Sequence, residues 1–332
     1  MKTPGFWYAT PTASLCPALL APLAALYARA AAHHRESKSP QDVALPVICL
    51  GNLVAGGSGK TPTAIALFKL LQSSKTFLSP GFLTRGYRGK IRTAERVDGS
   101  HDPALWGDEA LLLNQHGPTF VSPDRYRGAE LMADSGCDAI LMDDGLQNYT
   151  ITKDVSFAII DGLMGFGNGK VIPAGPLRQP LDQGLVLADA FILIGDDTRN
   201  VRALLPPDKP VFTATLAVTE AASVSQNVSY IGFCGIGFPD KFKKTLLDTG
   251  VNLSGWHTFG DHHTYTMNDI EKLVNEALSK KSRLITTEKD FARLPDFLKK
   301  SLIDVLPVEI TFSDPDGVIE FIKARTAAKT AS

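Results

Sequence analysis

The sequence predicts an α/β protein whose mostly parallel sheet is flanked by helices. Hydrophobic runs bounded by turn residues alternate with segments of helical periodicity along most of the chain, as in repeated strand–helix–strand units. A chain of 332 residues has room for one large domain and a smaller one. The composition, 44% hydrophobic and 21% charged, is that of an ordinary globular protein.

Strands are expected where short apolar runs lie between turn residues, and helices where apolar residues recur every three or four positions. The expected strands are Pro46–Leu53, Pro80–Thr84, Thr119–Ser122, Ala139–Met142, Val155–Ile160, Ala190–Ile194, Tyr230–Cys234, Arg283–Thr287 and Val305–Phe312. The expected helices are Thr63–Gln72, Asp108–Asn114, Asp124–Ser135, one after Pro239, and Met267–Ser279. A Gly/Pro-rich stretch between Gly162 and Gln183 has the length of a functional loop.

Three parts are predicted along the chain. Residues 1–35 hold an N-terminal amphipathic helix, residues 36–204 a core domain, and residues 205–332 a smaller C-terminal α/β domain. The boundary between the two domains rests on the linker Leu204–Pro210 (LLPPDKP), after which the alternating pattern restarts.

Charge and cysteine content narrow the classes of protein. The net charge of −1 gives no sign of broad electrostatic attraction to nucleic acid, so no nucleic-acid partner is predicted. No obligate protein partner is predicted either. The four cysteines, Cys16, Cys49, Cys137 and Cys234, are far apart and form no CxxC pair. Buried thiols in a reducing cytosol are therefore expected.

The N-terminal segment is unusual. Trp7 and Tyr8 precede an Ala/Leu-rich stretch over residues 15–32, whose longest apolar run ends at Arg29, short of the roughly 20 residues that span a bilayer. A signal peptide is a competing interpretation. An amphipathic helix at a membrane surface fits the aromatic and basic flanks better, while packing on the protein's own core stays open.

A glycine-rich turn, Gly56-Gly57-Ser58-Gly59-Lys60-Thr61, joins an expected strand to an expected helix. Glycines let backbone N–H groups converge on phosphates, and the helix N-terminus adds its positive dipole end. Lys60 can reach the β- and γ-phosphates, and the hydroxyl of Thr61 can bind Mg²⁺. Val54 occupies the first glycine position of the regular motif, and Ala55 stands where related loops often carry a lysine. The turn predicts a P-loop that binds Mg-ATP.

Carboxylates occur at two suitable places. Asp143 and Asp144 follow the expected strand Ala139–Met142, so one can address the metal while the other contacts a lysine, a water or the substrate. A plain Asp-Gly turn is the alternative. Asp108 and Glu109 begin an expected helix, where the helix dipole alone favours acidic residues.

Histidine and arginine supply further candidates. Asp261 precedes His262, and a neighbouring carboxylate can orient a histidine that takes a proton from a hydroxyl. Arg85 and Arg125 follow expected strand ends and could each clamp a phosphate, although surface ion pairs explain them equally well.

Taken together, these segments resemble the tetraacyldisaccharide 4′-kinases, the lipid A kinases of Gram-negative bacteria. The matching stretches run in the family's order from Leu50 to about Asp290: GNLVAGGSGKTP, TRGYRGK, GDEALLL, PDRYRGA, LMDDGLQ, FGNGKVIPAGPLRQP, CGIGFPDKF, FGDHH and TTEKD. The resemblance implies transfer of the γ-phosphate of ATP, with Mg²⁺, to the 4′-hydroxyl of a tetraacylated glucosamine disaccharide 1-phosphate. It also implies a P-loop core with a smaller C-terminal domain.

The resemblance also implies roles for individual residues. Asp108 and His262 would form the pair that activates the hydroxyl, with Lys60 and Asp144 also catalytic. The implied Mg²⁺ ligands are Thr61, Asp143, Asp144 and Glu109, and the substrate contacts are Arg85, Arg125, Asn148 and Asp261. The family pattern DDGxQH is not fully kept, because Asn148 stands in place of its histidine.

A lipid substrate implies a location for the protein, and three competing functions stay open. The chain is expected to lie peripherally on the cytoplasmic face of the inner membrane, with the N-terminal helix docked on the inner leaflet. A P-loop GTPase would need an [NT]-K-x-D element, which Thr287–Asp290 (TEKD) resembles only superficially. A nucleotide sensor without an acceptor would bind ATP through the same loop, and a kinase of soluble acceptors would use the same core.

Overall fold

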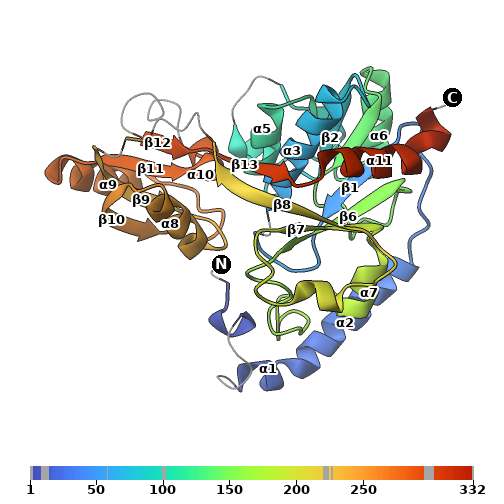
Figure 1. Ribbon diagram of the computed structural model, residues 1–332, viewed down its shortest axis with the longest axis horizontal. Helices are drawn as coiled ribbons and strands as arrows, with labels where there is room; N and C mark the ends of the chain where they lie inside the picture. The colour runs from blue at the N-terminus through green and yellow to red at the C-terminus, as the bar shows by residue number, and fades with distance from the viewer. Residues whose placement is uncertain are drawn as a thin grey trace. The chain divides into compact units, whose positions relative to one another are not determined.

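The computed structural model describes residues 3–8, 15–57, 59–98, 102–219, 224–225, 227–294 and 303–330. These residues form two compact units (Figure 1). The core unit comprises residues 4–216 and 310–330, and the smaller unit comprises residues 217–309 with Thr3. Both units contain a parallel sheet with helices against it, so the predicted α/β class is confirmed.

The core unit is built on a nine-stranded sheet of order β13-β8-β7-β6-β1-β5-β2-β4-β3. The neighbours from β8 to β4 are parallel, and β3 runs antiparallel to β4. The strands are β1 (Val47–Gly51), β2 (Pro80–Thr84), β3 (Glu95–Arg96), β4 (Thr119–Val121), β5 (Ala139–Met142), β6 (Val155–Asp161), β7 (Ala190–Ile194), β8 (Val211–Val218) and β13 (Val308–Phe312). Central β1 lies between β5 and β6, as expected for a strand that is buried on both faces.

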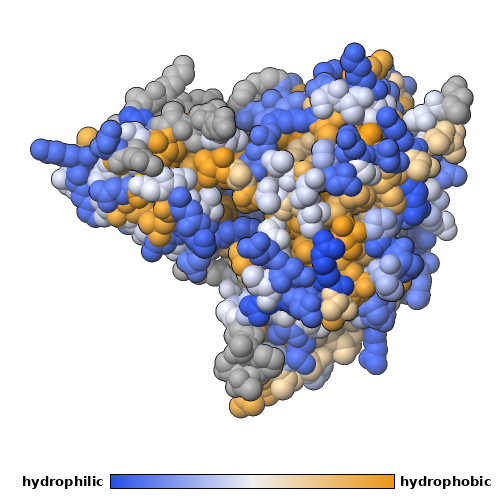
Figure 2. Space-filling model, viewed as in Figure 1, coloured by the Kyte–Doolittle hydropathy of each residue, from blue (hydrophilic) through white to orange (hydrophobic). Residues whose placement is uncertain are grey.

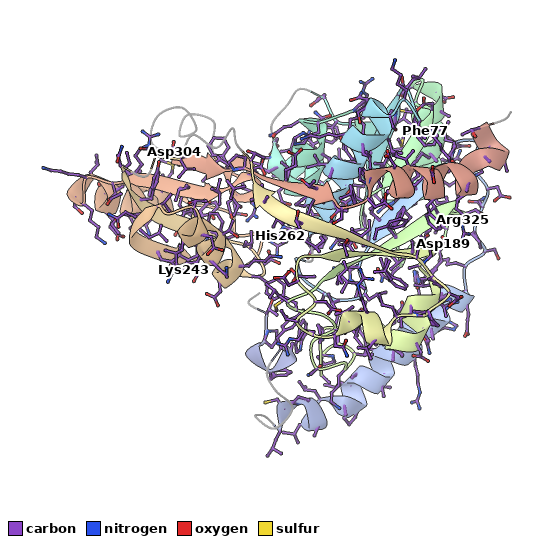
Figure 3. All side chains as sticks on the ribbon, viewed as in Figure 1. Phe77, Asp189, Lys243, His262, Asp304 and Arg325 are labelled. Carbon is purple, nitrogen blue, oxygen red and sulfur yellow. The ribbon has the colours of Figure 1, made fainter. Side chains whose placement is uncertain are left out.

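Helices cover both faces of this sheet. Because successive side chains of a strand point to opposite faces, Ile48 and Leu50 of β1 join the cluster under α3 and α11, while Val47 and Cys49 join the cluster under α6. The helices are α3 (Lys60–Ser73), α4 (Pro103–Trp106), α5 (Asp108–Asn114), α6 (Arg125–Asp134), α7 (Leu181–Val186) and α11 (Pro315–Thr330), with the 3-10 turns η1 (Gly5–Trp7) and η3 (Val201–Leu204). Figure 3 shows Arg325 of α11 beside Asp189, with which it forms an ion pair of 3.1 Å.

The smaller unit has a four-stranded parallel sheet of order β10-β9-β11-β12. Its strands are β9 (Ser229–Cys234), β10 (Asn252–Thr258), β11 (Arg283–Thr287) and β12 (Ile303–Leu306), and its helices are α8 (Pro239–Asp248), α9 (Met267–Ser279) and α10 (Glu288–Ala292). Thr266 and Asp269 form a capping box that fixes where α9 begins. One apolar cluster lies under α9 and another under α8.

The boundary between the two units differs from the prediction in two ways. The segment Val305–Phe312 is not one strand: Pro307, which has no N–H to donate, separates β12 of the small sheet from β13 of the large one. The division between the units also falls after Leu216 rather than at residue 204, because β8 follows the predicted linker and pairs with β7. The chain then returns to the core unit from residue 310 onward.

The N-terminal helices expose their leucines. α1 (Cys16–Leu19) and α2 (Ala21–Glu36) are joined through Leu20, which is itself helical in conformation. Leu15, Leu19, Leu23, Leu26 and Tyr27, spaced mostly three or four residues apart, are 82%, 77%, 54%, 60% and 41% exposed. In Figure 2 hydrophobic residues show at the lower edge, where Figure 1 places α1. These leucines therefore do not pack on the protein's own core, whereas Ala24 of α2 is buried, so the helix does contact the protein through another face.

The structure also bears on the expectations for Trp7, for the cysteines and for a membrane-spanning helix. The indole N–H of Trp7 donates to the carbonyl of Pro173 (3.1 Å), so that polar atom binds the protein rather than a lipid headgroup. Cys49, Cys137 and Cys234 are buried free thiols as predicted, whereas Cys16 is exposed at the start of α1. Within the described residues, no helix combines the length and apolar character needed to cross a bilayer.

Candidate functional site

The predicted P-loop connects β1 to α3. Gly59 has a left-handed backbone (φ 85°), a conformation that favours glycine. A Cβ there would lie 2.9 Å from Cδ1 of Ile194, so the end of that side chain would have to shift. The side chain of Asn52 donates to the carbonyl of Gly56 (3.3 Å) and braces the loop from within. Ser58, one of the predicted ATP contacts, lies outside the described residues. α3 begins at Lys60, so its first amides face the glycine turn.

The predicted acidic pair lies beside the P-loop, because β5 and β1 are parallel neighbours. Nζ of Lys60 lies 3.8 Å from Oδ1 of Asp144, and the hydroxyl of Thr61 donates to Oδ2 of Asp143 (3.4 Å). Asp143 is 1% exposed, whereas the side chain of Asp144, in a left-handed backbone (φ 52°), is 34% exposed. The two carboxylates thus have different partners.

Arg178 joins this cluster, and sequence reasoning gave it no role. Its guanidinium donates to both carboxylate oxygens of Asp144 (3.0 and 3.1 Å) and to Oε1 of Gln147 (3.1 Å). The backbone N–H of Arg178 donates to the carbonyl of Leu53 (2.9 Å). This bond connects the PAGPLR segment to the residues that immediately precede the P-loop. Its place in that matching segment, as the one cation between two prolines, was the available signal.

Surrounding cations set the charge of Asp144. Burial would raise the pKa of this carboxyl group, but Lys60 and Arg178 outweigh burial and lower it to about 2. Burial lowers the pKa of Arg125 to about 10, and the charge of Arg85 contributes in the same direction. Asp144 is therefore ionised at neutral pH within a cluster of cations, an environment suited to a polyanionic ligand.

Arg85 and Arg125 come after β2 and β4, as predicted. Arg125 is 3% exposed and donates through Nη1 to the carbonyl of Ser122, while Arg85 is exposed. Asp124 caps α6 by accepting from the amides of residues 126 and 127, which fixes where Arg125 enters the helix. Two nearby cations of this kind repel each other unless an anion lies between them.

Asp108 and Glu109 open α5, as the helix-start interpretation predicted. Asp108 is 5% exposed, and its carboxylate accepts from the amide of Glu109 (3.1 Å). Gly107 precedes them with φ 86°, and a Cβ there would lie 2.5 Å from the carbonyl of Tyr87. This close approach packs the GDE segment against the TRGYRG segment.

Asn148 uses its side-chain oxygen locally. Oδ1 accepts from both the amide (3.2 Å) and the hydroxyl (3.0 Å) of Thr150. These bonds form a turn that closes the DDGLQN segment.

His262 lies in the smaller unit, in a left-handed turn (φ 56°) after β10. Its Nε2 is 3.9 Å from Oδ1 of Asp261 and 3.3 Å from Nζ of Lys289, and its side chain is 11% exposed. Figure 3 labels His262 on the turn at the carboxyl end of the small sheet. Asp108 belongs to the core unit, so the two members of the predicted base pair lie in different units.

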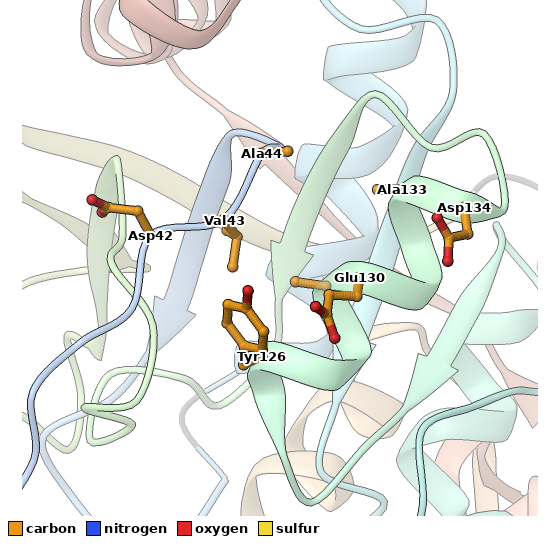
Figure 4. Close-up of a pocket in the computed structure, with 8 residues that line it drawn as sticks. Asp42, Val43, Ala44, Tyr126, Glu130, Ala133 and Asp134 are labelled. Atoms are coloured by element: carbon orange, nitrogen blue, oxygen red, sulfur yellow. The ribbon is translucent and has the colours of Figure 1, made fainter.

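A hollow on the core unit is separate from these groups. It lies between the segment before β1 and the outer side of α6, and it is lined by Asp42, Val43, Tyr126, Glu130 and Asp134 among others (Figure 4). No residue of the P-loop or of the acidic pair lines it. Within the described ranges, no group of three or more His, Cys, Asp or Glu side chains is arranged to hold a metal ion.

Known proteins resemble this chain along nearly its whole length. The tetraacyldisaccharide 4′-kinase of Paramagnetospirillum magneticum is 43% identical over 317 residues, covering 95% of this chain and 96% of that protein. The protein of the same name from Dinoroseobacter shibae is 41% identical over 321 residues, covering 95% and 94%. The fold matches the crystal structure of LpxK from Aquifex aeolicus in complex with ATP, with a TM-score of 0.74 and 23% identity over 94% of this chain and 99% of that one.

The family model described as tetraacyldisaccharide-1-P 4′-kinase matches residues 16–327. The resemblance found in the sequence motifs is thus confirmed, as is the prediction of a kinase. The chain belongs to the tetraacyldisaccharide-1-P 4′-kinase family.

Proposed function

We propose that the chain transfers the γ-phosphate of ATP to the 4′-hydroxyl of a tetraacyldisaccharide 1-phosphate, a step in the synthesis of lipid A. The observation that carries the proposal is the glycine turn at the end of β1, whose Lys60 and Thr61 face Asp144 and Asp143 at the end of β5. The names of the relatives and the family support the choice of acceptor.

The P-loop residues fit a nucleotide with Mg²⁺. The hydroxyl of Thr61 and the carboxylate of Asp143 are adjacent hard oxygen donors, the kind that Mg²⁺ prefers. Asp144 is paired with Lys60 and Arg178 and so is better placed to hold these side chains than a metal, and Glu109 is a further candidate ligand. Mg²⁺ held by these oxygens would neutralise negative charge on the phosphates of the nucleotide. Lys60 and the amides at the start of α3 add positive charge to the same groups.

His262 is proposed as the base that takes the proton from the attacking hydroxyl. Its ring is mostly buried and lies near Asp261, a carboxylate that can orient it. Asp108 is proposed to assist the same step, which the family resemblance implies. Arg85 and Arg125 are proposed to contact anionic groups of the substrates, because burial and mutual repulsion favour an anion between them.

The N-terminal helices are proposed to dock on the cytoplasmic face of the inner membrane. The exposed leucine face of α1 and α2 is interrupted by few polar side chains, and Arg29 and the basic end of α2 follow it. A helix of this kind lies in the bilayer interface with its apolar face in the acyl region. Docking there would bring the kinase to a substrate that stays in the membrane.

The decisive experiment is transfer of labelled γ-phosphate from ATP to a tetraacyldisaccharide 1-phosphate in mixed micelles, with and without Mg²⁺. We expect Mg²⁺-dependent labelling that falls by at least about 1000-fold in Lys60→Ala, because the cation beside the phosphates is lost. Lys69→Ala is the matched control, since Lys69 is an exposed residue of the same helix.

Three outcomes would count against the proposal. Unlabelled lipid with a folded, ATP-binding protein would favour the nucleotide sensor. Labelling of soluble sugars alone would favour a kinase of soluble acceptors. Competition by GTP as effective as by ATP would favour a GTPase.

A further inference from the structure

The TEKD segment, Thr287–Asp290, has no part in the proposed reaction, yet it contains a fully buried charge. Asp290 is 0% exposed. Its Oδ1 accepts from the amide of Gly235 (2.8 Å) and the hydroxyl of Tyr265 (2.7 Å), and its Oδ2 accepts from the hydroxyl of Thr287 (2.6 Å). Arg293, one turn further along, pairs with Oδ1 at 3.3 Å. Residues from three separate segments thus meet at one carboxylate.

Arg293 extends this cluster to the His262 turn. Its Nη1 donates to the carbonyl of Gly235 (3.1 Å) and to the carbonyl of His263 (3.4 Å). The same carbonyl of Gly235 accepts from the amide of His262 (3.0 Å). The N–H of Gly235 therefore donates to Asp290, and the C=O of Gly235 accepts from both Arg293 and His262. The turn bearing His262 is thus fixed through both polar groups of one residue.

Close packing at Gly235 makes this arrangement specific. A Cβ at this position would lie 3.0 Å from the carbonyl of Gly260 and 3.3 Å from Oδ1 of Asp290. Asp290 also raises the pKa of Tyr265, although burial is the larger cause, so the phenol stays protonated and acts as a donor. The charge pair itself adds little net stability, because desolvation of buried ions offsets their attraction. The main consequence of the Asp290–Arg293 pair is therefore the position that it gives to the His262 turn.

We propose that Asp290 and Arg293 are positioning residues for His262, holding its turn in a strained left-handed conformation. The inference rests on the proposed role of His262 as the base. Lys289 belongs to the same segment, and its Nζ lies 3.3 Å from Nε2 of His262. Asp290 and Thr287 bond to each other and fix the TEKD segment, which carries Lys289. This segment therefore places an ammonium group beside the imidazole of His262, in addition to fixing the backbone of its turn.

The test compares Asp290→Asn with Asp304→Asn in the full-length chain. Asp304 forms a bidentate pair with Arg283 (2.6 Å for both bonds) in the same unit, and Figure 3 shows it well apart from His262. We expect Asp290→Asn to lower kcat by about 100-fold with KM nearly unchanged, the effect of misplacing a reacting group by about 1 Å. Asp304→Asn should leave kcat unchanged, and it should cost less thermal stability because its partner Arg283 is partly exposed. Equal losses of kcat in the two variants would overturn the proposal.

A double-mutant cycle separates positioning from folding. In the His262→Ala background, Asp290→Asn should cause no further loss of turnover, since it acts through the missing ring. The same fold-loss in both backgrounds would mean that Asp290 acts on folding alone. Tyr265→Phe, which removes one bond to Asp290, serves if Asp290→Asn does not fold, and it should lower kcat by about 10-fold in the wild-type background only.

Amide hydrogen exchange tests the positioning role of Asp290 separately from the proposed role of His262 as the base. If His262→Ala retains full turnover, the assignment of the base fails whatever Asp290 does. Exchange at the amides of Gly235 and His262 needs no activity, and we expect it to accelerate by at least about 10-fold in Asp290→Asn but not in Asp304→Asn. Unchanged exchange in Asp290→Asn would overturn the positioning role itself.

Discussion

At the scale of single residues, the two neighbouring aspartates of the DDG turn have different environments. Asp143 is buried and contacts the hydroxyl of Thr61, whereas Asp144 is partly exposed and is paired with Lys60 and Arg178. The left-handed backbone of Asp144 turns the chain sharply after β5, so the two carboxylates diverge. One is thus suited to a metal and the other to organising the cations around the phosphates.

Arg178 provides a prediction about pH. Lys60 and Arg178 lower the pKa of Asp144 to about 2 from the ordinary value of 3.8, so the ionised carboxylate stabilises the folded chain above pH 3.8 and this contribution is lost as the pH falls to 2. We expect Arg178→Met to lower the free energy of unfolding at pH 6 by about 1 kcal/mol, a modest value because solvent screens a group that is a third exposed. The difference should shrink as the pH falls below 3.8.

Chemical denaturation at several pH values measures this difference. Arg127→Met is the control, since Arg127 pairs with Glu130 on the surface of α6. A wild-type–variant gap that stays constant from about pH 6 to about pH 2 would mean that Arg178 does not act through the charge of Asp144.

The sequence allowed part of this site to be predicted. Lys60, Thr61, Asp143 and Asp144 follow from a local motif and a strand end, whose positions depend on the parallel order of β1 and β5. Periodicity and strand ends could not assign Arg178, although it stands in a matching segment, because the hydrogen bond that positions it links its amide to Leu53 across a long separation in the chain. Contacts of that kind are set by tertiary packing and leave no periodic signal.

At the scale of elements, strands with continuous apolar runs were the predictable ones. β2, β5, β7 and β11 have the bounds that the sequence predicted, since each is buried along most of its length. β10 was missed, because its residues are only partly buried and alternate without an apolar run. α11 was missed too, although its apolar positions cover the core sheet.

The N-terminal helices give the prediction at this scale. The triple variant of Leu19→Ser, Leu23→Ser and Leu26→Ser should weaken binding to phospholipid vesicles by about 100-fold, taking about 1 kcal/mol for each leucine that is partly buried in the bilayer. The melting temperature should stay within about 2 °C, because these side chains are exposed in the folded protein.

Cosedimentation with vesicles measures this binding. Leu78→Ser with Leu247→Ser is the control, since these leucines are 75% and 51% exposed but lie outside α1 and α2. Equal weakening in the control would point to general hydrophobicity, and intact binding in the triple variant would contradict docking through this face.

At the scale of the whole molecule, the chain leaves the core unit, forms the smaller unit and then returns to the core unit. The last strand and helix of the core unit, β13 and α11, therefore come after the smaller unit in the sequence. No local pattern signals such a return. A linear division at residue 204 was the simplest interpretation of the sequence, and β8 and β13 are the strands that make the observed division different.

This path predicts the effect of removing the C-terminal segment. Val318, Ile319 and Ile322 of α11 are buried in the core cluster that also contains Leu67 and Phe157. Ending the chain after Glu309 removes all three and exposes their partners, at a cost of roughly 2 kcal/mol for each residue or about 6 kcal/mol in total. That loss is comparable to the entire stability of a typical domain, about 5–15 kcal/mol.

We therefore expect the chain that ends after Glu309 to lose the cooperative thermal unfolding of the core unit, while a chain that ends after Thr330, and so keeps all of α11, melts like the full-length protein. Differential scanning calorimetry distinguishes the two. The smaller unit keeps its own sheet and both of its apolar clusters in either chain, so any transition left in the shorter chain should belong to it. Intact unfolding of the core unit without β13 and α11 would show that the returning segment covers the sheet without being required for it.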